Sequence, residues 1–110
     1  MSNYKDWLDS ICVPVRERRI YFPGAKYPIQ VDGYDPVTNT VYEFLGDRVH
    51  GNLNRFHKDE PGYPNYKKTI AELNKEWLKR KKALEKLGYT VVFMWEYDYR
   101  ESRKTSKMAA

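Results

Sequence analysis

The sequence predicts a mixed α/β (α+β) fold, in which a mixed sheet of about four strands is flanked by helices. Three observations support this fold class. Residues 29–34 and 40–45 alternate apolar and polar side chains on either side of a turn cluster, as the two strands of a hairpin do. Residues 66–87 carry apolar side chains at helical spacing. Residues 89–95 form a strongly β-prone run, which we place inside the sheet.

The chain begins with a short predicted helix over residues 4–11. Three of its apolar residues have the three-to-four spacing of one buried face: Trp7, Leu8 and Ile11. Pro14 ends this helix, because a proline ring blocks further helical turns. A short strand is expected at residues 17–21, and Pro23-Gly24 then marks a turn before the hairpin.

After the hairpin, glycines and prolines interrupt residues 46–65, and this segment is expected to be an irregular loop, which in so small a domain is usually functional or mobile. The long helix is predicted to begin at about Tyr66. Its core-facing stripe comprises Ile70, Leu73, Trp77, Leu84 and Leu87. Gly88 stops the helix just after its last turn. From Glu96 the apolar content falls, so we expect a flexible basic tail from about residue 97.

Length and composition set the limits of the fold. A chain of 110 residues can build one modest core, so residues 1–110 are expected to form a single domain. The absence of a long apolar run and of a signal-peptide pattern predicts a protein without a membrane partner. With one cysteine there can be no internal disulfide and no thiolate-rich zinc cluster, so a reducing compartment, the cytoplasm, is expected.

The net charge of +5 is concentrated in one segment. Between residues 67 and 86, eight basic residues stand against three acidic ones, an excess equal to that of the whole chain. The tail adds four more basic residues: Arg100, Arg103, Lys104 and Lys107. A basic stripe of this kind is the expected footprint of a phosphate-backbone binder, although it is also typical of a solvated helix face.

Two acids of the predicted hairpin are candidate metal ligands. Asp32 and Glu43 are 11 residues apart, on two strands that can bring both carboxylates to one edge of the sheet. Two carboxylates and a backbone carbonyl are oxygen ligands that suit Mg²⁺. Such an ion would polarise a phosphodiester and lower the pKa of a bound water. The alternative is structural: Asp32 would belong to a turn, and Glu43 would be an exposed strand residue.

His50 follows the second strand of the hairpin by a short turn that contains Gly46. From there an imidazole could accept a proton from an attacking water, or hold a phosphate when protonated. A single loop histidine can also be structural. Its position shortly after two acids, in a chain with a basic helix, favours a role in catalysis.

Three segments of the chain occur in a specific order. They read Val-Asp-Gly-Tyr-Asp at 31–35, Thr-Val-Tyr-Glu-Phe-Leu-Gly-Asp-Arg-Val-His-Gly-Asn at 40–52, and Leu-Gly-Tyr-Thr-Val-Val-Phe-Met-Trp-Glu at 87–96. Together they resemble the very-short-patch-repair-like endonucleases of the PD-(D/E)XK superfamily, in the version found in phage homing endonucleases. The resemblance runs from about Trp7 to Glu96. It implies a restriction-endonuclease-like core and a nuclease acting on DNA.

The resemblance also implies roles for five residues. Asp32 would be the central metal ligand, and Glu43 falls at the superfamily's second acidic position. The carbonyl of Phe44 would complete the inner shell of an Mg²⁺ ion, with Mn²⁺ as a substitute. His50 would activate water or contact the phosphate. Glu17 matches an upstream acid that orients the histidine or a metal-bound water.

Three departures from the family pattern refine these expectations. Leu45 stands where the superfamily has a lysine, which excludes a lysine-based mechanism and favours one that uses the histidine. Trp77, with Glu76 adjacent, stands where some relatives have a further acid. The zinc-binding cysteines of the mismatch-repair members are missing, which favours a phage-type or homing-type nuclease. A phage-encoded protein of this kind would act in the cytoplasm of its host cell.

Two functions from different classes remain open. One is a metal-dependent DNA endonuclease; the other is a non-catalytic basic nucleic-acid-binding domain, in which Asp32 and Glu43 only hold a hairpin. The acids favour the nuclease, because a pure phosphate binder gains nothing from carboxylates beside a polyanion. The candidate DNA contacts are Asn52, Arg55, Lys79 and Lys82. We expect a monomer or weak homodimer, acting with or without a separate DNA-binding domain.

Overall fold

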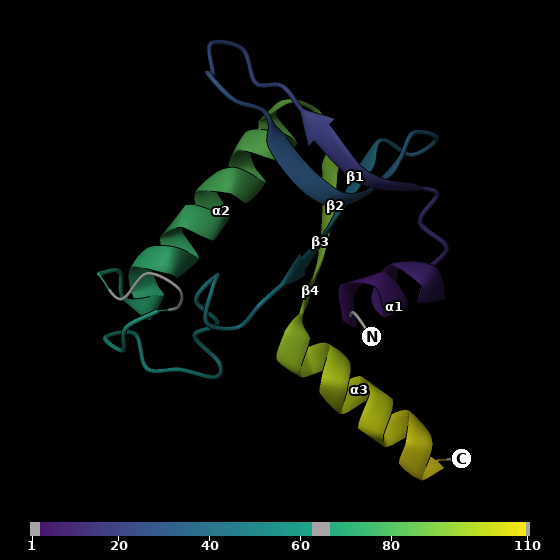
Figure 1. The fold of residues 1–110 in the computed structure, drawn as a ribbon, viewed down its shortest axis with the longest axis vertical. Helices are drawn as coiled ribbons and strands as arrows, with labels where there is room; N and C mark the ends of the chain where they lie inside the picture. Colours follow the sequence, from purple (N-terminus) through teal and green to yellow (C-terminus); the bar gives the residue numbers. More distant parts are fainter. Residues whose placement is uncertain (1–2, 63–66, 110) are drawn as a thin grey trace.

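The computed structural model describes residues 3–62 and 67–109 and contains one four-stranded mixed sheet (Figure 1). Its strands lie in the order β1-β2-β3-β4, with antiparallel pairing up to β3 and parallel pairing between β3 and β4. The strands are β1 (Val15–Ile20), β2 (Ile29–Asp35), β3 (Thr40–Leu45) and β4 (Thr90–Trp95). The helices of the described ranges are α1 (Asn3–Ser10), α2 (Ile70–Lys86) and α3 (Glu96–Ala109). The predicted mixture of helices and a mixed sheet is confirmed.

Helices cover both faces of the sheet. On one face, Leu84 of α2 packs with Val31 and Val41 of the two central strands. On the other face, Trp7 of α1 and Tyr99 of α3 form a second cluster, against which side chains of β3 and β4 pack. Figure 1 shows α2 on one side of the strands and the other two helices on the opposite side. The sheet therefore lies between two small apolar cores.

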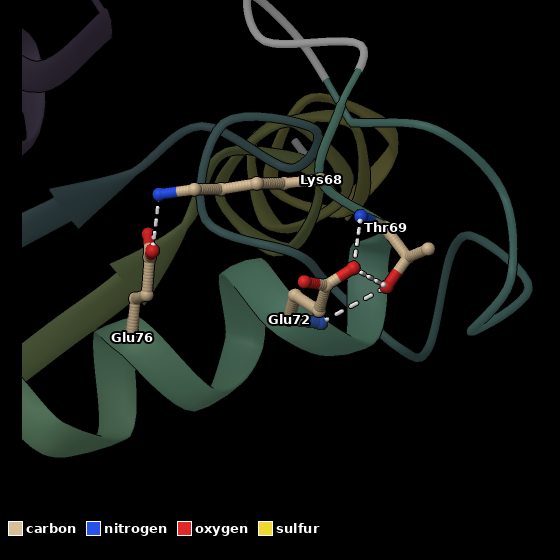
Figure 2. Close-up of polar contacts among 4 residues, drawn as sticks. All are labelled: Lys68, Thr69, Glu72 and Glu76. Carbon is tan, nitrogen blue, oxygen red and sulfur yellow. Dashed lines mark hydrogen bonds and ion pairs between the residues drawn. The ribbon is translucent and has the colours of Figure 1, made fainter.

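The long helix α2 begins with a capping box (Figure 2). The Thr69 side chain accepts a hydrogen bond from the Glu72 N–H, and the Glu72 carboxylate accepts one from the Thr69 N–H. These two bonds satisfy N–H groups that the first helical turn would otherwise leave unpaired. Beside them, Lys68 forms an ion pair with Glu76. The predicted helix start at Tyr66 lies outside the described residues.

The ends of several elements agree closely with the sequence. β3 matches its predicted strand residue for residue, and α1, β1 and β2 differ from theirs by one or two residues at the ends. Gly88 follows α2 with a positive φ of 100°, which glycine adopts without strain. Residues 46–62, the described part of the predicted loop, contain no helix or strand, apart from an isolated bridge at Pro61.

The placement of β4 inside the sheet is wrong. In the described ranges β4 pairs with β3 alone and forms an edge of the sheet. The inner side of β3 is already occupied by β2, its hairpin partner, so a parallel strand returning after α2 can reach only the outer side. Val92 and Phe93 are consequently 37% and 39% exposed.

The expectation of a fraying tail is also wrong, because residues 96–109 form α3. Tertiary contacts hold this helix despite its low apolar content. Tyr99 is buried in the core cluster with Trp7, and Asp47 accepts a hydrogen bond from the Tyr97 N–H in the first turn. Arg103 also lies 3.5 Å from a carboxylate oxygen of Asp6.

Two apolar residues assigned to buried helix faces are exposed. Ile11 lies beyond the end of α1 and is 42% exposed, and Val13 takes its place in the core. Leu87 caps the C-terminus of α2 and is 39% exposed. Both lie past the last regular turn, where helical periodicity no longer determines the direction of a side chain. Within the described residues, no helix combines the length and apolar character that crossing a bilayer requires.

Candidate active site

β2 and β3 separate halfway along their length. Within the described residues, three pairs join them: Gly33↔Tyr42, Tyr34↔Val41 and Asp35↔Thr40. β2 nevertheless continues to pair with β1 as far as Ile29. Asp32 and Glu43 are the first residues beyond the last pair of β2 and β3. The hairpin therefore brings both acids to the point where the two strands part.

Asp32 fills the gap that the departing strand leaves. Its Oδ2 accepts a hydrogen bond of 2.7 Å from the N–H of Phe44. In a strand the N–H and C=O of one residue point towards the same neighbour, so the Phe44 carbonyl is directed towards the same gap. Burial raises the pKa of Asp32, and the Phe44 N–H and the positive charge of Arg80 oppose this rise. Asp32 lies in a strand, which removes the alternative that it forms a turn.

Glu17 lies on β1 across from Asp32. β1 and β2 pair on both sides of this position, and Glu17 itself has a positive φ of 55°. Its Oε1 accepts a hydrogen bond of 3.1 Å from the Tyr4 hydroxyl, and this bond raises the pKa of Tyr4. The charge of Glu17 also contributes to the raised pKa of Asp32. Three acids are thus electrostatically linked at the strand junction, because Asp32 in turn raises the pKa of Glu43.

Glu43 is 4% exposed and forms an ion pair with Arg80 of α2. The Arg80 Nη2 donates to Glu43 Oε1 at 2.8 Å and to the carbonyl of Gln30 at 2.8 Å, so it bridges the two diverging strands. Burial raises the pKa of Glu43 to about 7, even though Arg80 acts in the opposite direction. The alternative of an exposed strand residue is therefore wrong for Glu43.

His50 is half-buried after the turn that follows β3. The backbone N–H of His50 donates to the Gly46 carbonyl at 3.1 Å. The His50 ring lies edge-on to the Trp77 ring, with the ring centroids 6.3 Å apart. Burial lowers the pKa of His50, and the positive charge of Arg80 lowers it further. Both effects favour the neutral imidazole, the form that can accept a proton. Trp77 itself is a buried packing residue.

Asn52 is 1% exposed, so its position does not support the predicted contact with DNA. Its side-chain amide donates to Asp47 Oδ1 at 2.9 Å, and its side-chain oxygen accepts from the Asn54 N–H at 3.0 Å. The same oxygen of Asp47 accepts from the Tyr97 N–H at the start of α3. Asn52 and Asp47 thus hold the loop against α3.

Arg55, the other predicted contact in the loop, is exposed and lies 4.0 Å above the ring of Tyr97. Arg48 lies 4.4 Å above the ring of Phe56 in the same loop. Arg48 also donates a hydrogen bond to the Pro61 carbonyl. A guanidinium group over an aromatic ring can still donate hydrogen bonds to phosphate oxygens. This side of the loop therefore suits a polyanion.

Lys79 and Lys82 are exposed on the outer side of α2, where they line a surface hollow of about 370 Å³ with Leu78. Arg80 belongs to the same basic run but points the other way, into the sheet. Other members of the run are engaged in ion pairs, such as Lys81 with Glu85. Within α2, the basic segment thus consists of lysines on the outer surface of the helix and one arginine, Arg80, whose side chain points into the sheet.

Sequence reasoning missed Arg80 as a site residue. Its Nε is buried and has no hydrogen-bond partner, the only such side-chain nitrogen or oxygen in the described ranges. A signal was present, since Arg80 stands three residues after Trp77 and four before Leu84. It therefore occupies a position on the apolar stripe of α2, and a cation there requires a buried partner.

Within residues 3–62 and 67–109, no group of three or more His, Cys, Asp or Glu side chains is arranged to hold a metal. Mg²⁺ commonly uses one or two carboxylates together with waters and substrate oxygens. Asp32, Glu43 and the Phe44 carbonyl fit that smaller set of oxygen donors. Searches against protein families, curated proteins and solved structures found no match to this chain.

Proposed function

We propose that this chain is a metal-dependent DNA endonuclease of the very-short-patch-repair-like, phage homing type, with Mg²⁺ as its cofactor. The observation that carries the proposal is the pair of acids at the strand junction, Asp32 and Glu43, both with raised pKa values. Burying carboxylates is unfavourable unless a function or a partner compensates for it. Perturbed acids that gather at one point are typical of catalytic sites.

Asp32, Glu43 and the Phe44 carbonyl are the groups that would hold Mg²⁺. When bound, the ion would polarise the scissile phosphate and stabilise the charge that develops on it. Arg80 keeps a positive charge against Glu43 on the side of α2. This leaves Asp32, whose side chain carries no ion pair among the described contacts, as the acid with the strongest need for a cation.

His50 is the proposed general base. Its neutral imidazole accepts the proton of a water whose oxygen forms a bond to phosphorus while the bond to one ester oxygen breaks. The departing oxygen takes a proton from solvent. Glu17, tied to Tyr4 and next to Asp32, is proposed to orient a water at this junction.

A supercoiled-plasmid assay tests the proposal. With Mg²⁺ we expect conversion to open-circular or linear DNA, and with a chelator we expect none. Mn²⁺ should replace Mg²⁺. DNA binding without cleavage under every metal condition would instead favour a non-catalytic nucleic-acid-binding domain.

We predict that cleavage by the wild-type chain rises with pH as His50 loses its proton. Because burial and Arg80 lower the pKa of His50, the part of the rise that depends on His50 should have its midpoint below the ordinary histidine pKa of about 6.5. His50→Ala should lose about 10²–10⁴-fold in rate, the usual contribution of a general base. Single-turnover rates across pH measure both effects. A His50→Ala protein with an unchanged rate and pH profile would refute the assignment.

We predict that Lys79 and Lys82 anchor DNA by charge and do not read its sequence. Replacing both with alanine should weaken binding about equally for all duplexes. The slope of log affinity against log salt should flatten by up to about 2, because each phosphate contact contributes about 0.9. Fluorescence anisotropy at several salt concentrations provides the measurement. An unchanged slope would mean that this face of α2 is only solvated.

A further inference from the structure

Residues 18–31 form a two-stranded arm that extends beyond the acids. β1 and β2 remain paired from Arg18↔Val31 to Ile20↔Ile29, whereas β3 no longer accompanies β2 there. Figure 1 shows the loop between β1 and β2 at the far end of the molecule from α3. From Asp32 the arm can reach roughly 20 Å, at about 3.3 Å per residue.

One face of the arm rests on α2. Ile20, Ile29 and Val31 pack in the cluster that contains Leu84 of α2. Because side chains of a strand alternate between its faces, Arg19 and Gln30, a cross-strand pair, point away from α2. Both are exposed, as is Tyr21, the first residue after β1.

The outward face and tip combine cations with exposed rings. Arg19 on the outward face and Lys26 near the tip are basic, and residues 18–30 contain no acid. Tyr21 and Tyr27 are 71% and 73% exposed, and the Lys26 ammonium lies 5.5 Å from the centre of the Tyr27 ring. Tyrosines are normally more buried than this, and rings beside cations are the usual components of surfaces that hold nucleic-acid strands.

We propose that this arm is a DNA-binding element of the nuclease, and the inference rests on the proposed function. Arg19 lies two residues from Glu17 along β1, and Gln30 lies two residues from Asp32 along β2, which is about 7 Å in each strand. A strand of DNA with its scissile phosphate at Asp32 therefore has neighbouring phosphates within reach of Arg19. Lys26 binds phosphate further along, and Tyr21 and Tyr27 stack on bases or sugars exposed near the cut.

The first test asks whether Arg19 and Lys26 bind DNA through their positive charges. Binding of the full chain to a labelled duplex is measured by anisotropy in chelator, where no cleavage occurs, at several salt concentrations. Arg19→Ala combined with Lys26→Ala should reduce the salt slope by about 2. The charge-preserving control, Arg19→Lys with Lys26→Arg, should keep the wild-type slope. Equal slopes for both double variants would overturn the charge contacts.

The second test addresses the rings. On a labelled duplex with a short single-stranded gap, in which bases are accessible, Tyr21→Ala with Tyr27→Ala should weaken binding about fivefold or more without changing the salt slope, whereas the matched Tyr→Phe pair should bind as wild type does. Thermal melts of all variants report folding. If a variant melts early, protection of Tyr21 and Tyr27 from iodination by bound DNA supplies the answer in the wild-type chain. Equal iodination with and without DNA would overturn the stacking contacts.

The outcomes distinguish this inference from the proposed function. If the wild-type chain shows no salt-dependent DNA binding and no cleavage, both fail. If the wild-type chain binds and cuts, and the arm variants do so equally well, only the arm is refuted. If the arm variants lose affinity while single-turnover cleavage at saturating protein stays near the wild-type rate, the arm binds DNA and takes no part in the chemistry.

Discussion

Asp32→Ala is expected to abolish cleavage while DNA binding stays the same or becomes tighter. The substitution removes a carboxylate that accepts a hydrogen bond from the Phe44 N–H and has no ion-pair partner among the described contacts. Losing the cation that it would hold removes several kcal/mol of transition-state stabilisation, which corresponds to a rate loss of at least about 10³-fold. Removing a negative charge near phosphate also lessens repulsion of DNA. Single-turnover cleavage and anisotropy measure the two effects separately.

Asp32→Asn is the matched control for this substitution. Its side-chain oxygen can still accept the hydrogen bond from the Phe44 N–H, so the strand junction should stay intact. Cleavage should nevertheless be lost, because an amide is a weak Mg²⁺ ligand without the negative charge. Wild-type cutting by Asp32→Asn protein would refute the metal role of this residue. If Asp32→Ala loses cleavage and Asp32→Asn does not, Asp32 has a structural role and is not a metal ligand.

Much of the fold could be predicted because local signals and burial agree along most of the chain. The alternating runs of the hairpin have both a turn cluster and a buried face, and the structure contains β2 and β3 at those positions. The stripe of α2 is likewise periodic, and four of its five predicted residues are buried: Ile70, Leu73, Trp77 and Leu84. Where tertiary contacts decide, as in α3 with Tyr99 and Asp47, composition alone predicted the wrong state.

The candidate site was predictable to the extent that it depends on strand pairing. Asp32 and Glu43 meet because the hairpin register brings them together. The burial of Asn52 was not predictable, because it depends on a loop folding back on Asp47 and the start of α3. To predict the role of Arg80, the basic run has to be interpreted as several lysines that point outward and one arginine that lies on the apolar stripe and points inward.

Arg80→Met is expected to destabilise the fold in a pH-dependent way. In the wild-type chain the pKa of Glu43 is about 7, above its ordinary value of 4.5. Stability that depends on this group is therefore fully present below pH 4.5 and declines as the pH rises towards 7, by about 3 kcal/mol in total. Above pH 7 the decline stops, because Glu43 is then ionised beside Arg80.

Without Arg80 the folded-state pKa of Glu43 rises further, so the decline should continue above pH 7 at up to about 1.4 kcal/mol per pH unit. The variant should thus differ modestly from wild type near pH 6 and by about 2 kcal/mol near pH 8.5. Urea denaturation at the two pH values measures this difference. Glu43→Gln in the Arg80→Met background should abolish the extra loss at high pH, since no buried carboxylate remains to ionise. A pH-independent penalty in Arg80→Met would mean that Arg80 stabilises the fold through packing and its bond to the Gln30 carbonyl, and not through the charge of Glu43.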